Sequence, residues 1–280
     1  MNALELLNSG SNKLQKQKIK THRIDSEILL SKVLNKSREQ ILIRLNQNMK
    51  NTEVFAFDNL IQRRLHKEPI AYIINEKEFW SKKFHVNKNT LIPRPETELL
   101  VEDLIKIYKN KNISLLDVGT GSGCIIISLL SELPNSKGLG IDISSSALKI
   151  AKHNALLHKV EDRIKFYNKS IINLFNCKFD LIVSNPPYID TKNIKNLDDD
   201  IKKYEPLIAL NGGNDGLDVI KKVIYKAKEI LKINGRLAIE IGNWQSKKVS
   251  KELKLNNFKI EKYIKDYKDN TRCLISRLIK

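Results

Sequence analysis

Cysteine is scarce in this sequence and has no recognisable metal-binding spacing. The 280 residues contain three cysteines, Cys124, Cys177 and Cys273. A sparse, odd-numbered set is typical of a reducing compartment rather than of a disulfide-stapled scaffold. The sequence therefore predicts neither a disulfide framework nor a metal site, and we expect a cytoplasmic protein.

Long hydrophobic runs are also missing. No stretch approaches the roughly 18 uncharged apolar residues that indicate a membrane-spanning helix. The opening residues, MNALELLNSG, lack the basic segment followed by an apolar run that marks a secretory signal peptide. We therefore expect no membrane partner.

Acidic residues are outnumbered by basic ones. The chain has 50 Lys and Arg against 32 Asp and Glu, a formal net charge of +18 at pH 7. A basic surface is compatible with a polyanionic partner such as RNA. A general bias toward Lys, Ile and Asn produces the same charge, and there is no arginine-rich block. The composition therefore allows direct nucleic-acid binding but does not require it.

The N-terminal third of the chain is poor in glycine and shows two kinds of pattern. Residues 1–70 carry apolar residues at helical spacing, which predicts a small helical N-terminal domain of four helices, and a substrate-docking role is compatible with it. Residues 71–91 are rich in β-formers, which predicts a β-hairpin linker. We expect its first strand around Ile70–Ile74 and its turn at Lys82-Lys83. Residues 92–280 then form the largest domain.

From about residue 113, short apolar runs alternate with helical stretches. The runs ISLLDV, GLGIDI, RIKFY, FDLIVS and GRLAIEI are typical of strands. Such alternation predicts a doubly wound, mostly parallel sheet, in which ligands bind beyond the carboxyl ends of the strands. The predicted fold class is therefore α/β, with a Rossmann-like sheet over residues 92–280.

A glycine-rich turn follows the first of these strands. Its residues are Gly119, Thr120, Gly121, Ser122 and Gly123. Glycine permits positive φ and close approach of a ligand, and Asp142 at the end of the next strand is placed to hydrogen-bond a ribose diol. Two cofactors fit this arrangement. Nicotinamide dinucleotides prefer G-x-G-x-x-G, whereas the third glycine here comes one residue early, which favours S-adenosyl-L-methionine.

The run FDLIVS ends on Asn185, Pro186, Pro187 and Tyr188, at the same rim as the glycine turn. A planar NH2 group is a poor nucleophile because its lone pair is delocalised, so it has to be oriented. The Asn185 side-chain oxygen and the Pro186 carbonyl can accept its two N–H bonds, while the prolines hold that carbonyl rigidly. Tyr188 offers a flat face for stacking. Orientation of this kind supplies on the order of 7–11 kcal/mol, and the pattern predicts methyl transfer to a planar amino group.

These motifs resemble those of class I S-adenosylmethionine-dependent methyltransferases that modify planar amino groups. More of the chain is similar to one branch, the release factor N5-glutamine methyltransferases of the PrmC/HemK family. The similar stretches are IPRPETE at 92–98, DVGTGSGCI at 117–125, SNPPYI at 184–189, Glu205-Pro206, and Glu240-Ile241-Gly242 with Gln245. The resemblance implies methylation of the glutamine N5 in the Gly-Gly-Gln motif of peptide chain release factors.

The resemblance also implies a role for each predicted site residue. The glycine turn would hold the methionine part of S-adenosyl-L-methionine and Asp142 its ribose. Asn185 to Tyr188 would hold the target amide, with Asn185 also near the cofactor. Ser170 lies where family members place an adenine-contacting residue, often an acidic or aromatic one. We expect Arg94 to help close the site.

Other functions stay open at this point. A nucleic-acid amino methyltransferase, acting on DNA adenine N6 or on rRNA, shares the NPPY tetrapeptide and explains the positive charge, although no added target-recognition segment is present. A non-catalytic module that binds S-adenosylmethionine is disfavoured by the intact NPPY. A nicotinamide-dependent oxidoreductase is disfavoured by the glycine spacing.

Overall fold

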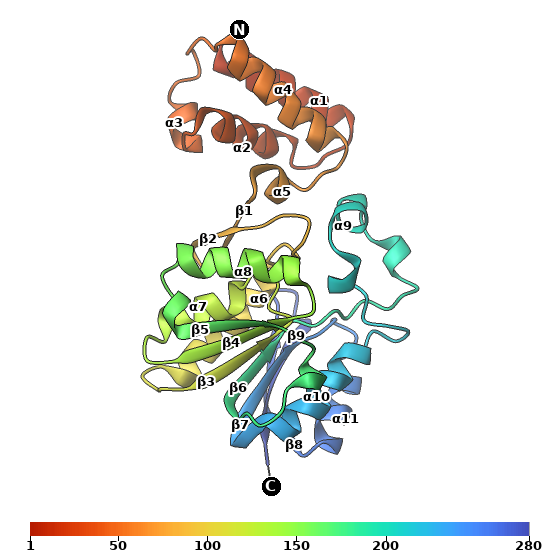
Figure 1. Ribbon diagram of the computed structural model, residues 1–280. Coiled ribbons are helices and arrows are strands. Elements are labelled where there is room, and N and C mark those ends of the chain that lie inside the picture. The colour runs from red at the N-terminus through yellow and green to blue at the C-terminus, as the bar shows by residue number, and fades with distance from the viewer. Residues whose placement is uncertain (280) are drawn as a thin grey trace. The chain divides into compact units, whose positions relative to one another are not determined.

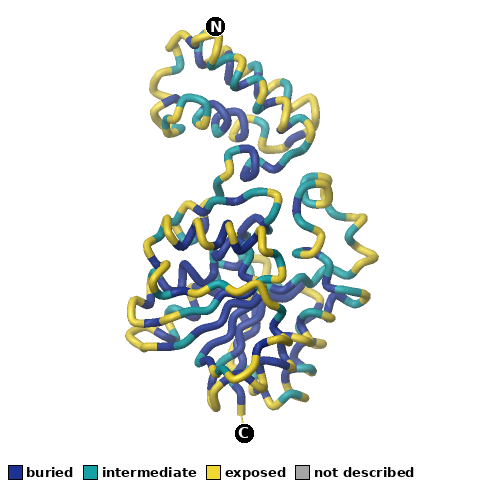
Figure 2. The backbone as a smooth tube through the Cα atoms, viewed as in Figure 1, coloured by how far each residue is buried: buried dark blue, intermediate teal, exposed yellow. Residues whose placement is uncertain are grey.

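The computed structural model describes residues 1–279, which fold into two compact units. Residues 1–75 and 199–204 form the first unit, and residues 76–198 with the chain from residue 205 onward form the second. Each unit buries apolar residues of its own elements, and the dark blue segments of Figure 2 mark the buried residues along the chain. The predicted division into residues 1–70, 71–91 and 92–280, with a docking role for the first, stays a prediction.

The first unit is helical. Its helices are α1 (Ala3–Lys16), α2 (His22–Leu34), α3 (Arg38–Leu42), α4 (Asn51–Leu65), α5 (Ile70–Ile74) and α9 (Asp199–Tyr204). The expected helical N-terminal region is therefore confirmed. Leu14, Leu29 and Phe57 are fully buried in its core. One ion pair is buried with them, between Arg64 of α4 and Asp25 of α2, at 2.7 Å.

Residues Ile70–Ile74 differ from the sequence prediction. They were expected to open a hairpin as a strand but form helix α5. Pro69 precedes the helix, and its ring removes an N–H that the first turn of a helix does not need. Asn75 ends the helix with φ of 57°, in the left-handed conformation that terminates many helices. These flanking residues outweigh the β-propensity of the isoleucines.

The hairpin itself is present but shorter than expected. Strands β1 (Glu76–Phe79) and β2 (Lys82–His85) pair antiparallel. The turn lies at Trp80 and Ser81, both with φ of 52°, and not at Lys82-Lys83 as the sequence suggested. Positive φ at both central residues closes a two-residue hairpin with the twist that its strands need.

The second unit is built on a seven-stranded sheet with the order β5-β4-β3-β6-β7-β9-β8. Its strands are β3 (Ser114–Val118), β4 (Lys137–Asp142), β5 (Ile164–Asn168), β6 (Phe179–Ser184), β7 (Leu231–Glu240), β8 (Phe258–Lys265) and β9 (Thr271–Leu278). The five strands from β5 to β7 are parallel, and only β9 runs against its neighbours. The predicted Rossmann-like sheet is confirmed.

Helices cover both faces of this sheet. The helices are α6 (Pro95–Tyr108), α7 (Cys124–Glu132), α8 (Ser145–Leu157), α10 (Asp218–Ile230) and α11 (Ser246–Leu255). Figure 1 shows α6, α7 and α8 on one face, with α10 and α11 on the other. Ser144 begins α8 as the sequence predicts, because its hydroxyl oxygen accepts a hydrogen bond from the Ala147 N–H at 3.1 Å. No helix within residues 1–279 is long and apolar enough to cross a membrane.

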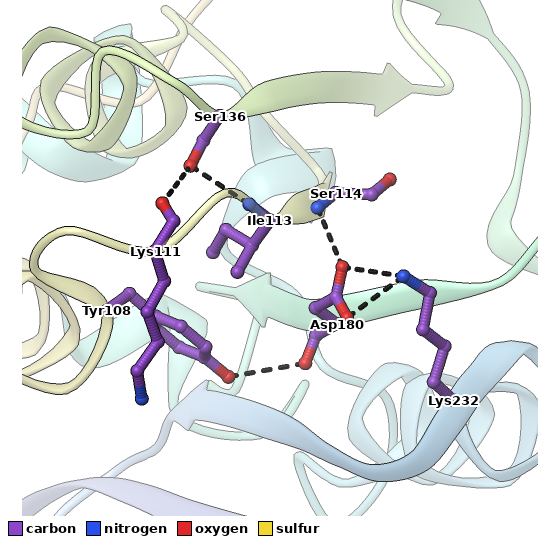
Figure 3. Close-up of polar contacts among 7 residues, drawn as sticks. All are labelled: Tyr108, Lys111, Ile113, Ser114, Ser136, Asp180 and Lys232. Carbon is purple, nitrogen blue, oxygen red and sulfur yellow. Dashed lines mark hydrogen bonds and ion pairs between the residues drawn. The ribbon is translucent and has the colours of Figure 1, made fainter.

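A polar network ties the amino ends of the central strands together (Figure 3). The Asp180 carboxylate on β6 accepts the backbone N–H of Ser114 on β3 at 2.8 Å and pairs with Lys232 on β7 at 2.8 Å. The Tyr108 hydroxyl at the end of α6 donates to the Asp180 carbonyl at 3.2 Å. These contacts fix the register of three strands, and that register decides what meets at their opposite ends.

Candidate active site

A cavity of about 640 Å³ opens beyond the carboxyl ends of β3, β4 and β6, within the roughly 300–1,000 Å³ typical of small-molecule sites. The predicted site residues that line it are Gly119, Thr120, Gly121, Ser122, Asp142, Ser170, Asn185 and Pro187. Three predicted residues within the described chain do not line it, namely Gly123, Pro186 and Tyr188. The cavity therefore joins most, but not all, of the predicted residues.

The position of the cavity follows from the strand order. The chain passes from β3 outward to β4 and β5, and then returns to β6 on the other side of β3. Val118, the last residue of β3, pairs with Ser184, the last residue of β6. The glycine turn and Asn185 consequently leave neighbouring strands side by side, at the crevice where doubly wound sheets bind ligands.

The glycine turn leaves open space where side chains would otherwise stand. Gly119 has φ of +71°, and a Cβ added there would meet no protein atom within 4 Å. Gly121 has φ of +55°, and its added Cβ would meet only the Gly119 carbonyl oxygen, at 3.9 Å. Gly123 differs, because its Cβ would lie 2.8 Å from Ile127 of α7 and 3.3 Å from Ala151 of α8. The first two glycines admit a ligand, whereas the third allows two helices to pack closely.

Asp142 links the glycine turn to helix α8. One carboxylate oxygen accepts the Gly121 N–H at 2.9 Å, and the other accepts the Ser144 N–H at 2.8 Å. Burial raises the pKa of Asp142 above its ordinary value, against the opposing effect of the backbone N–H groups of Ser144, Gly121 and Ile143. Each oxygen keeps a lone pair, so the carboxylate can still accept a hydroxyl from a ligand.

A second acid, Asp117, lies beneath the turn. One of its oxygens accepts the Thr120 hydroxyl at 2.7 Å, while the other is buried without a hydrogen-bond partner in the described structure. Burial raises the pKa of Asp117 to about 7. Cys124 also lines the cavity, but burial raises the pKa of its thiol to about 12. A thiol with that pKa is a poor nucleophile at neutral pH.

The NPPY loop, residues 185–188, is held by hydrogen bonds from the buried side chain of Gln245, which is 1% exposed. Its amide nitrogen donates to the carbonyls of Tyr188 and Gly216, both at 3.0 Å, and its amide oxygen accepts the Gly242 N–H at 2.9 Å. Three loops that follow different elements are thereby joined through one amide. Asn185 is held in this rigid frame at the cavity wall.

Tyr188 and Pro186 do not line the cavity. Tyr188 packs against the apolar cluster formed by the sheet with α10 and α11, and burial raises the pKa of its phenol. Pro186 is buried. The stacking role of Tyr188 and the acceptor role of the Pro186 carbonyl stay predictions.

The segment after β5 supplies a mixed wall. Lys169, Ser170 and Ile171 line the cavity there, as does Ile143 from the loop after β4. The Asn168 side-chain amide donates to the Asp142 carbonyl at 2.9 Å, which holds the two loops together. Ser170 thus lies on the cavity as predicted, between a basic and an apolar residue.

Two further residues of the cavity wall, Arg94 and Thr97, come from the loop before α6 and from its first turn. Arg94, expected to help close the site, lines the cavity and pairs with the buried Glu205 carboxylate at 2.6 Å. The other Glu205 oxygen accepts the Ile92 N–H at 3.2 Å. Thr97 also lines the cavity, in the first turn of α6. Only similarity to family motifs signalled Glu205 and Thr97.

Within residues 1–279, no group of three or more His, Cys, Asp or Glu side chains is placed to hold a metal ion.

Comparison with known proteins is consistent with this geometry. The PrmC N-terminal domain family matches residues 5–74, and a methyltransferase domain family matches residues 109–275. A release factor glutamine methyltransferase from Clostridium botulinum is 39% identical over 277 residues, covering 98% of each chain. A bifunctional methyltransferase from Rickettsia typhi is 39% identical over 290 residues, covering 96% of this chain but 56% of its own length. The chain thus spans little more than half of such bifunctional relatives.

A solved structure supports the fold alone. A methyltransferase from Pyrococcus furiosus superposes with a TM-score of 0.55 at 18% identity, over 80% of this chain and 100% of that one. The likeness agrees with the Rossmann-like sheet of the second unit.

Proposed function

The chain belongs to the release factor glutamine methyltransferase family, and we propose that it methylates the glutamine side-chain nitrogen, N5, in the Gly-Gly-Gln motif of peptide chain release factors, using S-adenosyl-L-methionine. The observation that carries this proposal is the pairing of Val118 with Ser184, which brings the glycine turn and Asn185 to one cavity. A methyl donor and a planar amide can meet in this cavity. The sequence contains one NPPY tetrapeptide, so no other part of that rim offers such a loop.

The residues of the cavity fit S-adenosyl-L-methionine. The open space over Gly119 and Gly121 suits its amino-acid part, and the unpartnered oxygen of Asp117 is an acceptor beside that turn. Asp142 keeps lone pairs for the ribose hydroxyls, and Ser170 with Ile171 lies where the adenine is expected. When bound, this cofactor supplies an electrophilic methyl group on a sulfonium.

The protein's own part in the reaction is orientation. Asn185 presents a side-chain amide at the cavity wall, and its oxygen can accept one N–H of the target amide. We assign the second N–H to the Pro186 carbonyl. With both N–H bonds held, the nitrogen lone pair would point toward the methyl group. As the N–C bond formed, the S–CH3 bond would break and leave a neutral thioether, and one N–H proton would pass to solvent, giving a neutral N-methyl amide. No strongly basic side chain is needed, because holding the amide in a reactive geometry lowers the barrier.

The docking of a release factor is assigned to the N-terminal helical region, residues 1–70. Two reasons support it: this region matches the PrmC N-terminal domain family, and the cavity is lined only by residues of the second unit. A release-factor substrate places the reaction in the cytosol. The charge of +18 does not by itself call for a nucleic-acid substrate.

The test is a methyl-transfer assay with isotope-labelled S-adenosyl-L-methionine. Unmodified release factor, duplex DNA and ribosomal RNA are offered in parallel, and the peptides are read by mass spectrometry. We expect label on the glutamine of Gly-Gly-Gln, lost in Asn185→Ala while cofactor binding persists. Asn196→Ala, an exposed asparagine after the same loop, is the matched control. Label only on nucleic acid would overturn the substrate, and cofactor binding without any transfer would indicate a non-catalytic module.

A further inference from the structure

Three polar side chains form a line that leads from the sheet to the cavity. Glu240 ends β7, Thr97 lies in the first turn of α6, and Asn185 follows β6. The Thr97 hydroxyl donates to the Glu240 carboxylate at 2.6 Å, and the Asn185 side-chain nitrogen donates to the Thr97 oxygen at 3.4 Å. Thr97 is 2% exposed and Glu240 is 3% exposed. Thr97 and Glu240 are therefore largely shielded from water, and the line borders the cavity at Thr97 and Asn185.

The chemistry of these groups decides which atom donates and which accepts in each hydrogen bond of the line. An ionised carboxylate can only accept hydrogen bonds, so the Thr97 hydroxyl must use its single proton toward Glu240. The Thr97 oxygen is then left with lone pairs only, and it can bind the NH2 end of Asn185 but not the oxygen end. The amide oxygen of Asn185 is consequently turned away from Thr97.

That direction matters because an asparagine amide has two unlike ends of nearly the same shape. If the amide were rotated by half a turn, it would present its NH2 group to the cavity, and an N–H donor cannot accept the N–H of a substrate amide. We propose that Glu240 and Thr97 are positioning residues that set the direction of the Asn185 amide, so that its oxygen faces the nitrogen to be methylated. This inference rests on the proposed function, since it assigns a role within that reaction.

The protonation state of Glu240 decides whether the direction holds. A protonated Glu240 can donate to the Thr97 oxygen, and the Thr97 hydroxyl is then free to donate to the oxygen of Asn185. Donor and acceptor would exchange places in both hydrogen bonds, and the Asn185 amide would turn its NH2 end to the cavity. Neutral Glu240 therefore corresponds to a site that binds cofactor but orients the substrate poorly.

Several titratable and charged groups face Glu240. They are Glu96 of α6, Cys124 of α7, Tyr188 after β6, and Arg272 and Cys273 of β9. Burial is the largest influence and raises the pKa of Glu240, and Glu96 acts in the same direction. The hydrogen bond from Thr97 opposes this effect most, followed by the charge of Arg272 and a weaker direct interaction with the Asn185 amide, and the pKa is left at about 7. Both directions of the line are thus accessible near neutral pH.

Three variants test the role of the line through the methyl-transfer reaction. Thr97→Val keeps the shape and removes the hydroxyl, Thr97→Ser keeps the hydroxyl, and Glu240→Gln removes the charge. We expect Thr97→Val to lower kcat on the order of 10- to 100-fold, as small misplacements in active sites do, with KM for the release factor and Kd for the cofactor within about threefold of wild type. Thr97→Ser should restore most of kcat. Ser276→Ala removes another fully buried hydroxyl, which donates to the Leu237 carbonyl, and serves as the control.

The pH profile separates orientation from simple structural damage. The kcat of the wild type should rise as the pH increases through about 7, where Glu240 loses its proton, and this step should be absent in Glu240→Gln. A wild-type kcat in Thr97→Val would overturn the proposal. So would an equal loss of kcat in Thr97→Val, Thr97→Ser and Ser276→Ala, because that result indicates a packing defect.

A readout that needs no substrate keeps the inference distinct from the proposed function. In protein labelled with [15N]asparagine, the Asn185 side-chain signal is identified by its absence in Asn185→Ala. We expect this signal to shift with a midpoint near pH 7 in the wild type, and to be pH-independent in Glu240→Gln. A signal that ignores both pH and Thr97→Val overturns the inference whatever the substrate is. A coupled signal without methylation of the release factor supports the line while the proposed substrate fails.

Discussion

Replacing Gln245 with methionine should both destabilise the protein and loosen the NPPY loop. The two side chains are similar in length and volume, so the change removes hydrogen bonds with little change in packing. Gln245 is 1% exposed and serves three backbone groups: the carbonyls of Tyr188 and Gly216, and the N–H of Gly242. Methionine can satisfy none of them well.

The magnitude follows from those three contacts. A buried polar group left without its partner costs about 1–3 kcal/mol. Three such groups give about 3–6 kcal/mol when some relaxation is allowed. That loss is a large share of the total stability of a typical domain, which is about 5–15 kcal/mol.

Urea denaturation followed by circular dichroism measures the loss of stability, and the labelled-methyl assay measures kcat. We expect both to fall, with kcat reduced even where the variant is fully folded, because Asn185 stands on the loop that Gln245 holds. Gln62→Met on the exposed face of α4 is the control and should change stability by less than about 0.5 kcal/mol. A Gln245→Met protein that loses under about 1 kcal/mol and keeps its kcat would refute the reasoning.

Two further predictions concern buried charge. Burial raises the pKa values of Asp117 and Glu240 to about 7, so between pH 4 and 7 the folded chain holds protons that the unfolded chain has lost. The free energy of unfolding should therefore fall as pH rises through this window, by up to about 1.4 kcal/mol per pH unit for each group, and level off above pH 7. Urea denaturation of cofactor-free protein at pH 5, 6, 7 and 8 checks this against Asp117→Asn with Glu240→Gln, and parallel slopes for the two proteins would contradict it. In the first unit, Arg64→Met should cost about 3–5 kcal/mol, because it leaves the buried Asp25 carboxylate unpaired. Restoration of stability by adding Asp25→Leu would confirm that cause, whereas an unchanged urea midpoint in the single variant would rule it out.

Local pattern was sufficient for the elements that surround the cavity. The alternation of apolar runs with helical stretches predicted the parallel sheet, and Ser144 marked the start of α8. The sequence predicts one rim for the glycine turn, Asp142 and Asn185, because each lies at the carboxyl end of a predicted strand. Such features depend on backbone period and turn chemistry, which are properties of neighbouring residues in the sequence.

Local pattern failed where flanking residues or packing decide. Ile70–Ile74 have the β-propensity of a strand, but Pro69 and Asn75 enclose them in a short helix. The partial burial of Tyr188 against the apolar cluster of the sheet with α10 and α11 was likewise not signalled by the sequence, and its stacking role stays a prediction. Side-chain orientation at the end of a strand depends on what is packed beneath it, and that information is not local.

The sequence by itself determined the kind of chemistry that we propose, because the residues assigned to cofactor binding and to amide orientation lie in short recognisable motifs. Only the tertiary structure decided how Asn185 is held. Thr97 and Glu240 are far from Asn185 in the chain, and they reach it because α6 packs on a sheet in which β6 and β7 are neighbours. A hydrogen-bond direction that passes through three such elements exists only once the sheet has formed.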